Sequence, residues 1–143
     1  MIIKKVFISG PMTGLPNLNR DAFNEAEKLL KAAGFSVFNP AWLDLDPGFS
    51  DADIAAIDLA ALKRCNYIYQ LEGWEKSKGA SAEWMVAMWC GLKPVNKEWL
   101  EWYANINGTK EIINKADLPE SIYNHAMGMF KVHEDITKEA GNA

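Results

Sequence analysis

The sequence predicts an α/β fold in which a parallel sheet carries helices on both faces. Short apolar segments rich in β-branched residues alternate along the chain with segments in which apolar residues recur at helical spacing. Gly or Pro marks most of the changes between them. Strands joined through helices of this length run parallel, with right-handed crossovers. At 143 residues and 49% hydrophobic composition, the chain has enough apolar side chains for one continuous core.

The first part of the chain predicts two strands and one helix. Residues 2–9 are short, apolar and β-branched, and Gly10-Pro11 ends them, so we expect a buried first strand. Apolar residues at helical spacing follow over residues 19–33, where Gly34 is a typical C-cap. Residues 35–38 form a second short strand, which Asn39-Pro40 ends.

The middle of the chain repeats this alternation. A loop rich in Asp, Pro and Gly over residues 41–50 leads to a helix that Ser50 or Asp51 can cap and that reaches about residue 64. Residues 67–71 predict a third strand, residues 81–90 a third helix, and Pro94-Val95 the start of a short fourth strand.

The pattern changes to helices alone after residue 96. Residues 98–104 are rich in Trp and Tyr, and residues 119–139 are amphipathic. We therefore expect an α/β domain over residues 1–96 and a helical extension over residues 97–143 that packs on the domain or on a second subunit.

Composition excludes several classes of protein. The net charge is −4, and the 15 basic residues are scattered among 19 acidic ones, so no cationic surface for a nucleic-acid polymer is expected. No apolar run approaches the roughly 20 residues that a membrane span needs. Cys65 and Cys90 lack metal-type spacing and are typical of core positions in a reducing compartment. We expect a cytoplasmic protein with no metal and no cofactor.

Three loops follow the carboxyl ends of the predicted strands, where parallel sheets bind ligands. They cover residues 10–19, 39–50 and 72–81 and are rich in Gly, Pro and small polar residues. The first, SGPMTGLPN, is consistent both with a tight turn and with a loop whose backbone approaches an anion or a sugar. In the second, Trp42 could stack on a base or cover the core.

Asp58 is the first candidate for chemistry. In the second predicted helix Ile54, Ile57 and Leu62 belong to an apolar stripe, and Asp58 is four residues from both Ile54 and Leu62, so it points along that stripe. An ionised carboxylate there is costly unless something pairs with it. Asp58 therefore either lies at the border of the stripe or belongs to a functional site.

Glu83 is the second candidate. Residues 76–83 connect the third strand to the third helix, and their amides could receive an anion at the helix start. If Ser81 caps that helix, Glu83 is an ordinary acid of the first turn. Two carboxylates from neighbouring strand ends in one pocket would instead suit glycosidic chemistry, in which one attacks the anomeric carbon and the other assists.

Four segments carry a family resemblance. VFISGPMTG, FNPAW, DIAAIDLAALKRCNYIYQL and GWEKSKGASAEWMVA occur in the order seen in the nucleoside 2-deoxyribosyltransferase-like proteins. These include the 2′-deoxynucleoside 5′-phosphate N-hydrolases and short proteins often encoded by phages and prophages. The resemblance covers about residues 4–95. It implies a flavodoxin/Rossmann-like three-layer fold with a parallel sheet of about four to five strands, a homo-oligomer, and, if the chain is phage-encoded, the host cytoplasm.

The resemblance also implies roles for residues. Glu83 matches the family's nucleophile, which attacks C1′ of a deoxyribonucleoside, and Asp58 matches the helical Asp proposed to assist departure of the base. Ser77 and Gly79 match the residues that hold a 5′-phosphate. The expected binding set for a nucleoside or nucleotide is Ser9, Gly10, Pro11, Met12, Thr13, Asn39, Trp42, Ser77, Gly79 and Ser81.

The chain departs from the family pattern at three places. Phe7 stands where many members have a Tyr that bonds the catalytic carboxylate, Met12-Thr13 where the monophosphate hydrolases have an Arg, and Asn66 where many have an acid. Three functions therefore remain open. The favoured one is cleavage or exchange of an N-glycosidic bond. The others are nucleotide binding without catalysis, and a phage or host interaction protein that uses the tail residues Trp99, Trp102 and Tyr103.

Overall fold

The computed structural model of the chain describes residues 3–115, 119, 120, 124 and 128, without the side chains of residues 108–115. Its contacts divide the chain into two compact units, Met1–Lys97 and Glu98–Ala143.

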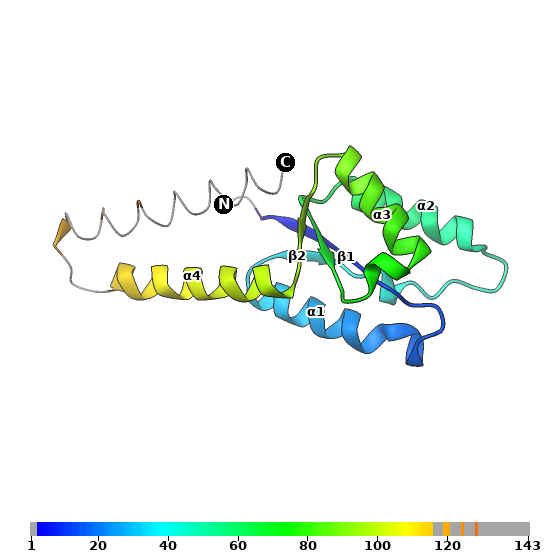
Figure 1. The fold of residues 1–143 in the computed structure, drawn as a ribbon, viewed down its shortest axis with the longest axis horizontal. Helices are drawn as coiled ribbons and strands as arrows, with labels where there is room; N and C mark the ends of the chain where they lie inside the picture. Colours follow the sequence, from blue (N-terminus) through cyan, green and yellow to red (C-terminus); the bar gives the residue numbers. More distant parts are fainter. Residues whose placement is uncertain (1–2, 116–118, 121–123, 125–127, 129–143) are drawn as a thin grey trace. The chain divides into compact units, whose positions relative to one another are not determined.

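The first unit is built on a four-stranded parallel sheet (Figure 1). The strands are β1 (Lys5–Ser9), β2 (Ser36–Phe38), β3 (Tyr67–Gln70) and β4 (Lys93–Val95), in the order β2-β1-β3-β4. Each neighbouring pair is parallel. The sequence prediction of a parallel sheet is thus confirmed, and β1 lies in its interior.

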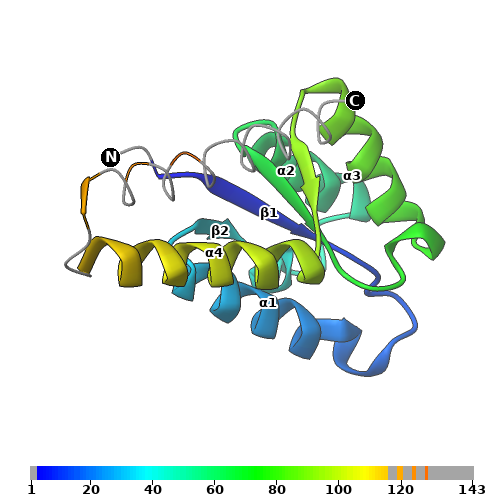
Figure 2. The same ribbon diagram turned by 60° about the vertical axis from the view of Figure 1, so that its left-hand side comes forward.

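Helices cover both faces of this sheet. Helix α1 (Arg20–Ala32) lies on one side of β1, and α2 (Asp51–Leu62) and α3 (Lys78–Trp89) lie on the other, as both ribbon views show (Figures 1 and 2). Short 3-10 turns, Pro16–Asn19, Pro40–Trp42 and Trp74–Lys76, follow the first three strands. This arrangement confirms the predicted α/β three-layer fold.

The core on the α2 and α3 side contains one cluster of buried apolar residues. Its members are Phe7, Leu62, Ile68, Ala87 and Leu92. The ring of Phe7 is fully buried and stacks on Phe38 with 5.4 Å between centroids. Burial of such side chains is the main favourable term in folding. Phe7 is therefore committed to the core.

Helix α3 begins at Lys78, three residues earlier than predicted. Ser77 is its N-cap, and the Ser77 Oγ accepts a hydrogen bond from the Ala80 N–H at 3.2 Å. The hydroxyl of Ser81 instead donates to the Glu75 carbonyl at 3.3 Å. Either serine could cap a helix locally, and the upstream one does. Glu83 consequently lies in the second turn of α3, beyond the first-turn position that the sequence predicts.

Ile57 also differs from the prediction. The sequence places it on the buried stripe of α2, but 40% of its surface is exposed. The helix is apolar on nearly every side, so its sequence has no strong periodicity to say which side faces the core.

In the second unit, α4 (Lys97–Lys115) extends well beyond the predicted residues 98–104. Within it, the rings of Trp99 and Tyr103 stack with 5.1 Å between centroids. Most of the helix expected over residues 119–139 lies outside the described residues. Among the helices that are described, none has the length and apolar character to cross a membrane.

Candidate active site

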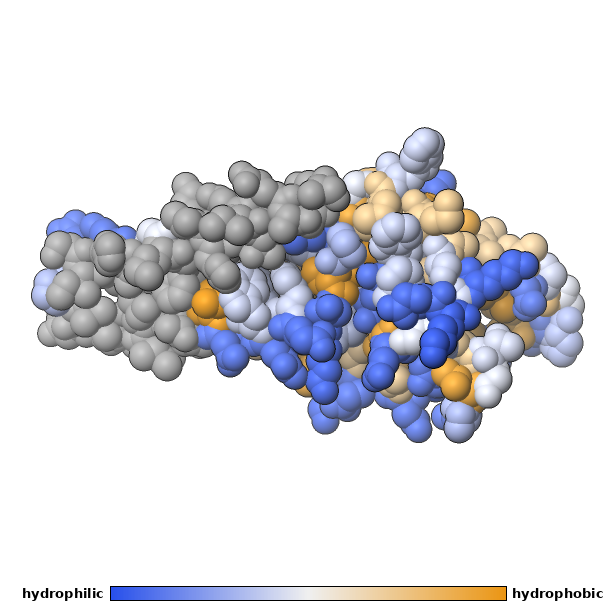
Figure 3. Space-filling model, viewed as in Figure 1, coloured by the Kyte–Doolittle hydropathy of each residue, from blue (hydrophilic) through white to orange (hydrophobic). Residues whose placement is uncertain are grey.

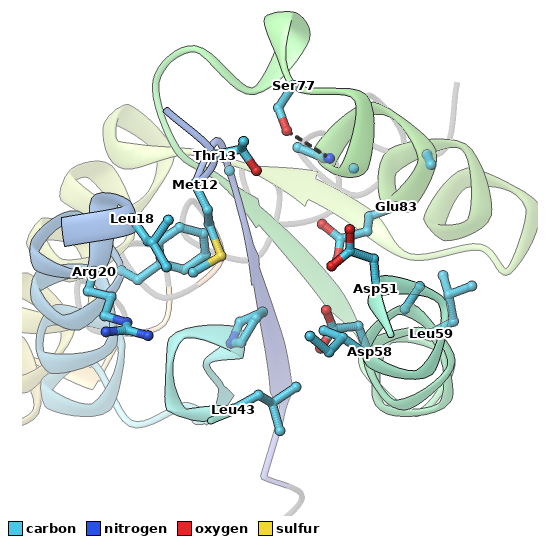
Figure 4. Close-up of a pocket in the computed structure, with 18 residues that line it drawn as sticks. Met12, Thr13, Leu18, Arg20, Leu43, Asp51, Asp58, Leu59, Ser77 and Glu83 are labelled. Carbon is cyan, nitrogen blue, oxygen red and sulfur yellow. Dashed lines mark hydrogen bonds between the residues drawn. The ribbon is translucent and has the colours of Figure 1, made fainter. Parts of the chain in front are cut away.

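A cavity of about 500 Å³ opens at the carboxyl edge of the sheet, within the first unit. Segments that follow β1, β2 and β3 line it together with α1, α2 and α3 (Figure 4). Its polar lining includes Asp51, Asp58, Glu83, Arg20, Thr13 and Ser77, and its apolar lining includes Met12, Leu18, Phe23, Pro40, Leu43, Ile54 and Leu59. The volume is typical of sites for small molecules.

Glu83 is held by a hydrogen bond from β1. The Ser9 Oγ donates to Glu83 Oε1 at 2.9 Å, and Ser9 itself is buried. Ser9 is the last residue of β1, two positions beyond Phe7, so both side chains lie on the same face of the strand. Phe7, which stands where many family members have a Tyr that bonds the carboxylate, packs in the core. In this chain the hydroxyl that bonds Glu83 comes from Ser9 instead.

Glu83 and Asp58, which both line the cavity, have raised pKa values. Burial raises the pKa of Glu83 from 4.5 to about 7; the Ser9 hydrogen bond opposes this rise, and the charge of Asp58 adds to it. Burial raises the pKa of Asp58 from 3.8 to about 6. Asp58 Oδ1 is buried, and no described group forms a hydrogen bond with it. The two acids therefore interact in a setting that favours uptake of a proton near neutral pH.

The N-terminus of α3 opens onto the same cavity. Ser77 and Gly79 both line it, and the first N–H groups of a helix have no carbonyl partner within the helix. A Cβ built on Gly79 would meet no atom within 4 Å. Gly79 is therefore not required by packing within the described structure, and it leaves free space beside amides that suit an anion.

Arg20 faces the cavity from the opposite wall. It is the first residue of α1, and Figure 4 shows it across the cavity from Asp58 and Glu83. Its Nε is buried without a hydrogen-bond partner among the described residues. The predicted binding set missed Arg20 and also Asp51, which the sequence presents as a helix cap. From the sequence, Arg20 is only one of several cations, with Lys78, that could hold a phosphate.

The predicted binding residues divide into two groups. Gly10, Met12, Thr13, Ser77 and Gly79 line the cavity, whereas Ser9, Pro11, Asn39, Trp42 and Ser81 do not.

Asn39 and Trp42 hold the end of β2. Asn39 is fully buried, and its Oδ1 accepts from the Ala41 N–H at 2.9 Å. Trp42 packs on Phe38, and its Nε1 donates to Glu27 at 2.8 Å. Because Trp42 is 50% exposed, these contacts fit both interpretations of the ring, as cover for the core and as a surface for a base.

Asn66 has a structural role. Asn66 Oδ1 accepts from the Lys5 N–H at 2.9 Å, which ties β3 to β1 at the sheet edge opposite Ser9. Within the described part of the chain, no three His, Cys, Asp or Glu residues gather in a way that could hold a metal ion.

Comparisons with known proteins identify a family and a shared fold. The model of a family described as "Domain of unknown function (DUF4406)" matches residues 4–96. No curated protein matches the chain. A 2-deoxyribosyltransferase from the psychrotolerant bacterium Bacillus psychrosaccharolyticus has a similar structure, with a TM-score of 0.53 and 17% identity over 64% of this chain and 70% of that one.

A 2-deoxyribosyltransferase from Leishmania mexicana is also similar, with a TM-score of 0.52 and 18% identity over 65% of this chain and 63% of that one. At this level of identity, the two solved structures and the chain share a fold. The predicted resemblance to the nucleoside 2-deoxyribosyltransferase-like proteins is therefore confirmed at the level of the fold.

Proposed function

Because the chain belongs to the family described as a domain of unknown function (DUF4406), we propose its reaction from the site itself. The chain cleaves or exchanges the N-glycosidic bond of a (deoxy)nucleoside or its 5′-monophosphate through a covalent glycosyl intermediate on Glu83. The observation that carries this proposal is the Ser9–Glu83 hydrogen bond in a cavity that also contains Asp58. A buried carboxylate oriented by a hydroxyl, beside a second acid, is the arrangement that glycosyl transfer needs.

The reaction has two steps. In the first, Glu83 Oε2 attacks C1′ while Oε1 keeps its hydrogen bond to Ser9. The C1′–N bond breaks, its electron pair leaves with the base, and protonated Asp58 supplies the proton that the departing nitrogen needs. In the second, water or another base attacks C1′, the bond between C1′ and Glu83 Oε2 breaks with its electron pair returning to the carboxylate, and the ionised Asp58 takes the proton that the attacking water or base loses.

The pKa values set how often this division of roles is populated. With values of about 7 for Glu83 and about 6 for Asp58, the two acids hold close to one proton between them slightly below neutral pH, and the higher pKa of Glu83 places that proton on Glu83 more often than on Asp58. The reactive form, in which the proton is on Asp58 and Glu83 is ionised, is therefore the less populated of the two one-proton forms. Desolvation, which raises both values, also strengthens the attack of an ionised Glu83 on a carbon that develops positive charge.

The remaining walls fit the parts of a nucleotide. The apolar residues Leu18, Phe23 and Leu43 offer a surface for a planar base, and the amides at the start of α3 suit a 5′-phosphate. Arg20 offers donors to an acceptor group on the ligand. Both similar structures are of 2-deoxyribosyltransferases, which agrees with a nucleoside as substrate.

The test uses purified wild-type chain with a panel of nucleosides, 2′-deoxynucleosides and their 5′-monophosphates, with and without a second base. Chromatography follows the free and the exchanged base. We expect release or exchange by the wild type and loss of turnover in Glu83→Gln, while Glu72→Gln, a change at an exposed acid, keeps full activity. Intact-mass analysis of quenched reactions should detect a glycosyl adduct in the wild type and none in Glu83→Gln.

Turnover of no compound in the panel would overturn the proposal. If thermal stabilisation by a nucleotide occurs without turnover, the chain is a nucleotide-binding protein that has lost catalysis, because a ligand that binds only the folded state raises its stability.

A further inference from the structure

Arg20 differs from most charged residues of α1. Asp21, Glu25 and Lys28 are exposed along this helix, and hydrophilic colours predominate over α1 in Figure 3. Arg20 is instead partly buried and lines the cavity, and its Nε is buried without a hydrogen-bond partner among the described residues. A buried donor without an acceptor is unfavourable, so such a group in a cavity is normally satisfied by water or by a bound ligand. Arg20 is therefore a candidate contact for the substrate.

The charges of the cavity lining are separated. Asp51, Asp58 and Glu83 come from α2 and α3, whereas Arg20 comes from α1. Figure 4 shows Arg20 across the cavity from Asp58 and Glu83. The proposed reaction places the sugar at Glu83, and the amides at the start of α3 suit the 5′-phosphate. The base is therefore the part of the ligand that can extend toward α1.

The wall around Arg20 is apolar. Phe23 follows Arg20 by three residues on α1, which places both on the same side of the helix, and both line the cavity. Leu18, two residues before Arg20, also lines it. Apolar side chains suit the faces of a planar base, and a single polar group among them orients the base by one of its edges.

The guanidinium group restricts which edge fits. It has five N–H donors and no acceptor. A carbonyl group of the base can accept from it, whereas an exocyclic amino group at the same place would set donor against donor and leave both unsatisfied. In a 6-oxopurine, N7 stands beside O6, so both atoms can accept from one guanidinium, which is how arginine pairs with guanine in DNA.

We propose that Arg20 selects nucleosides whose base presents a carbonyl group over those with an amino group in its place, and 6-oxopurines above all. This selectivity rests on the proposed function. The guanidinium donates to O6 and N7 of hypoxanthine or guanine, and to one carbonyl of uracil or thymine. Because the base leaves with the electron pair of the C1′–N bond, the same donors also stabilise the negative charge that develops on it. The preference should therefore appear in kcat/KM.

Matched pairs of nucleosides test this selectivity with the purified full chain. 2′-Deoxyinosine and 2′-deoxyadenosine differ in the group at C6 of the base, and 2′-deoxyuridine and 2′-deoxycytidine in the group at C4. We expect the wild type to favour the carbonyl member in kcat/KM, by roughly 10- to 100-fold for the purine pair and by less for the pyrimidine pair.

Variants at position 20 show whether Arg20 causes the preference. Arg20→Met keeps a long side chain but removes the donors, so both ratios should approach one. Arg20→Gln should move the purine ratio toward adenine, because a glutamine amide pairs with N6 and N7 of adenine. Arg64→Met, at an exposed arginine outside the cavity lining, is the matched control and should keep the wild-type ratios. Circular dichroism verifies that each variant is folded.

Turnover without a carbonyl preference, or wild-type ratios in both Arg20→Met and Arg20→Gln, would overturn the selectivity and leave the proposed function standing. If Arg20→Met raises KM for 5′-monophosphates alone, Arg20 holds the phosphate and the selectivity is again wrong. Turnover of no nucleoside would overturn the proposed function, and thermal shifts then decide the selectivity. Stabilisation of the wild type by 2′-deoxyinosine beyond 2′-deoxyadenosine, lost in Arg20→Met, would support it, and equal or absent shifts would overturn it.

Discussion

The Ser9 hydroxyl influences both the orientation and the pKa of the Glu83 carboxyl group. It donates to Glu83 Oε1 at 2.9 Å and opposes the rise in pKa that burial causes. It comes from an interior strand, whose ladder hydrogen bonds on both sides restrict its movement. The carboxylate is therefore oriented from a strand that is paired on both sides.

Replacing Ser9 should shift the pH dependence of the proposed reaction. The hydrogen bond lowers the pKa of Glu83, so Ser9→Ala should raise that pKa and move the acidic limb of the kcat/KM profile to higher pH. Ser9→Thr keeps a hydroxyl at this position and should restore much of the wild-type profile. The pH–rate profiles of the three proteins provide the measurement, and an acidic limb unmoved in Ser9→Ala would contradict this role.

Site residues differed in how far the sequence could predict them. The spacing of Asp58 from Ile54 and Leu62 was enough to turn it inward, because helix periodicity is local information. The partner of Glu83 is 74 residues away, and only the assembled sheet brings Ser9 to it. From the sequence, Phe7 was a departure from the family because it cannot bond the catalytic carboxylate. The structure shows that the Ser9 hydroxyl, two residues further along β1, forms that hydrogen bond.

At the scale of elements, the segment before α1 has an unusual backbone. Asn17, Leu18 and Asn19 all have positive φ angles, of 51°, 53° and 58°. Asn tolerates this region, but a leucine there costs roughly 1–2 kcal/mol. Leu18 lines the cavity, and Asn19 Nδ2 donates to the Pro11 carbonyl at 2.8 Å. The strained backbone conformation at position 18 places the Leu18 side chain in the wall of the cavity.

Glycine substitution should reveal this strain. Leu18→Gly removes the unfavourable φ at position 18, whereas Leu15→Gly removes a leucine of similar exposure, 41% against 43%, from an ordinary φ of −96°. Both changes lose apolar contact and loosen the unfolded chain. We therefore expect Leu18→Gly to be the less destabilising by about 1–2 kcal/mol in denaturant unfolding. Equal losses in the two variants would argue against strain at Leu18.

The start of α3 allows a second test at this scale. In Gly79→Ala the new Cβ meets no described atom, and Ala is the better helix former, so stability should rise by up to about 1 kcal/mol. The same methyl group would occupy space beside the first amides of α3, so KM for a 5′-monophosphate should rise more than KM for the nucleoside. Gly48→Ala, at an open loop position outside the cavity lining, is the control. Equal KM changes for both substrates would place the phosphate elsewhere.

Most elements were predictable because their signals are local. The strands were found within one to three residues, since β-branched runs ended by Gly or Pro are distinctive. The start of α3 was wrong because Ser77 and Ser81 both suit a cap, and only the contact of Ser81 with Glu75 separates them. Ile57 was wrong because an apolar helix lacks the alternation that assigns its faces.

At the scale of the whole molecule, the chain should be less stable at alkaline pH because of Glu83. Its pKa is 4.5 when exposed and about 7 in the fold, so the folded state binds a proton that the unfolded state releases. This stabilisation is fully present below about pH 4.5 and is lost as the pH rises through about 7.

Glu83→Gln should remove this dependence. We expect the variant to unfold like the wild type near about pH 4.5 and to exceed it in free energy of unfolding by roughly 3 kcal/mol well above pH 7. Urea titrations at about pH 5 and about pH 8 supply the measurement, and Glu72→Gln is the control at an exposed acid. A constant difference between wild type and Glu83→Gln across this range would contradict the raised pKa of Glu83.

The layered fold could be predicted because alternating strands and helices permit few topologies. The exposure of Trp89 was not predicted, since composition alone cannot distinguish an apolar side chain in the core from one at the surface. Trp89 and Ala87 belong to the same apolar run, yet one is 90% exposed and the other fully buried. Only the positions of the helices on the sheet separate them.

The interior position of β1 has a consequence for synthesis of the chain. The ribosome makes β1 first, but its two neighbours, β2 and β3, begin 31 and 62 residues later. Until both have been made, β1 has unpaired edges and its apolar side chains lack their cover, which is the condition in which nascent chains aggregate. Ser9 can meet Glu83 only when α3 has followed. Of the four strands, the first to be made is therefore paired on both sides only late in synthesis. A chain interrupted before α3 would expose the aggregation-prone β1 strand and would lack the Ser9–Glu83 hydrogen bond.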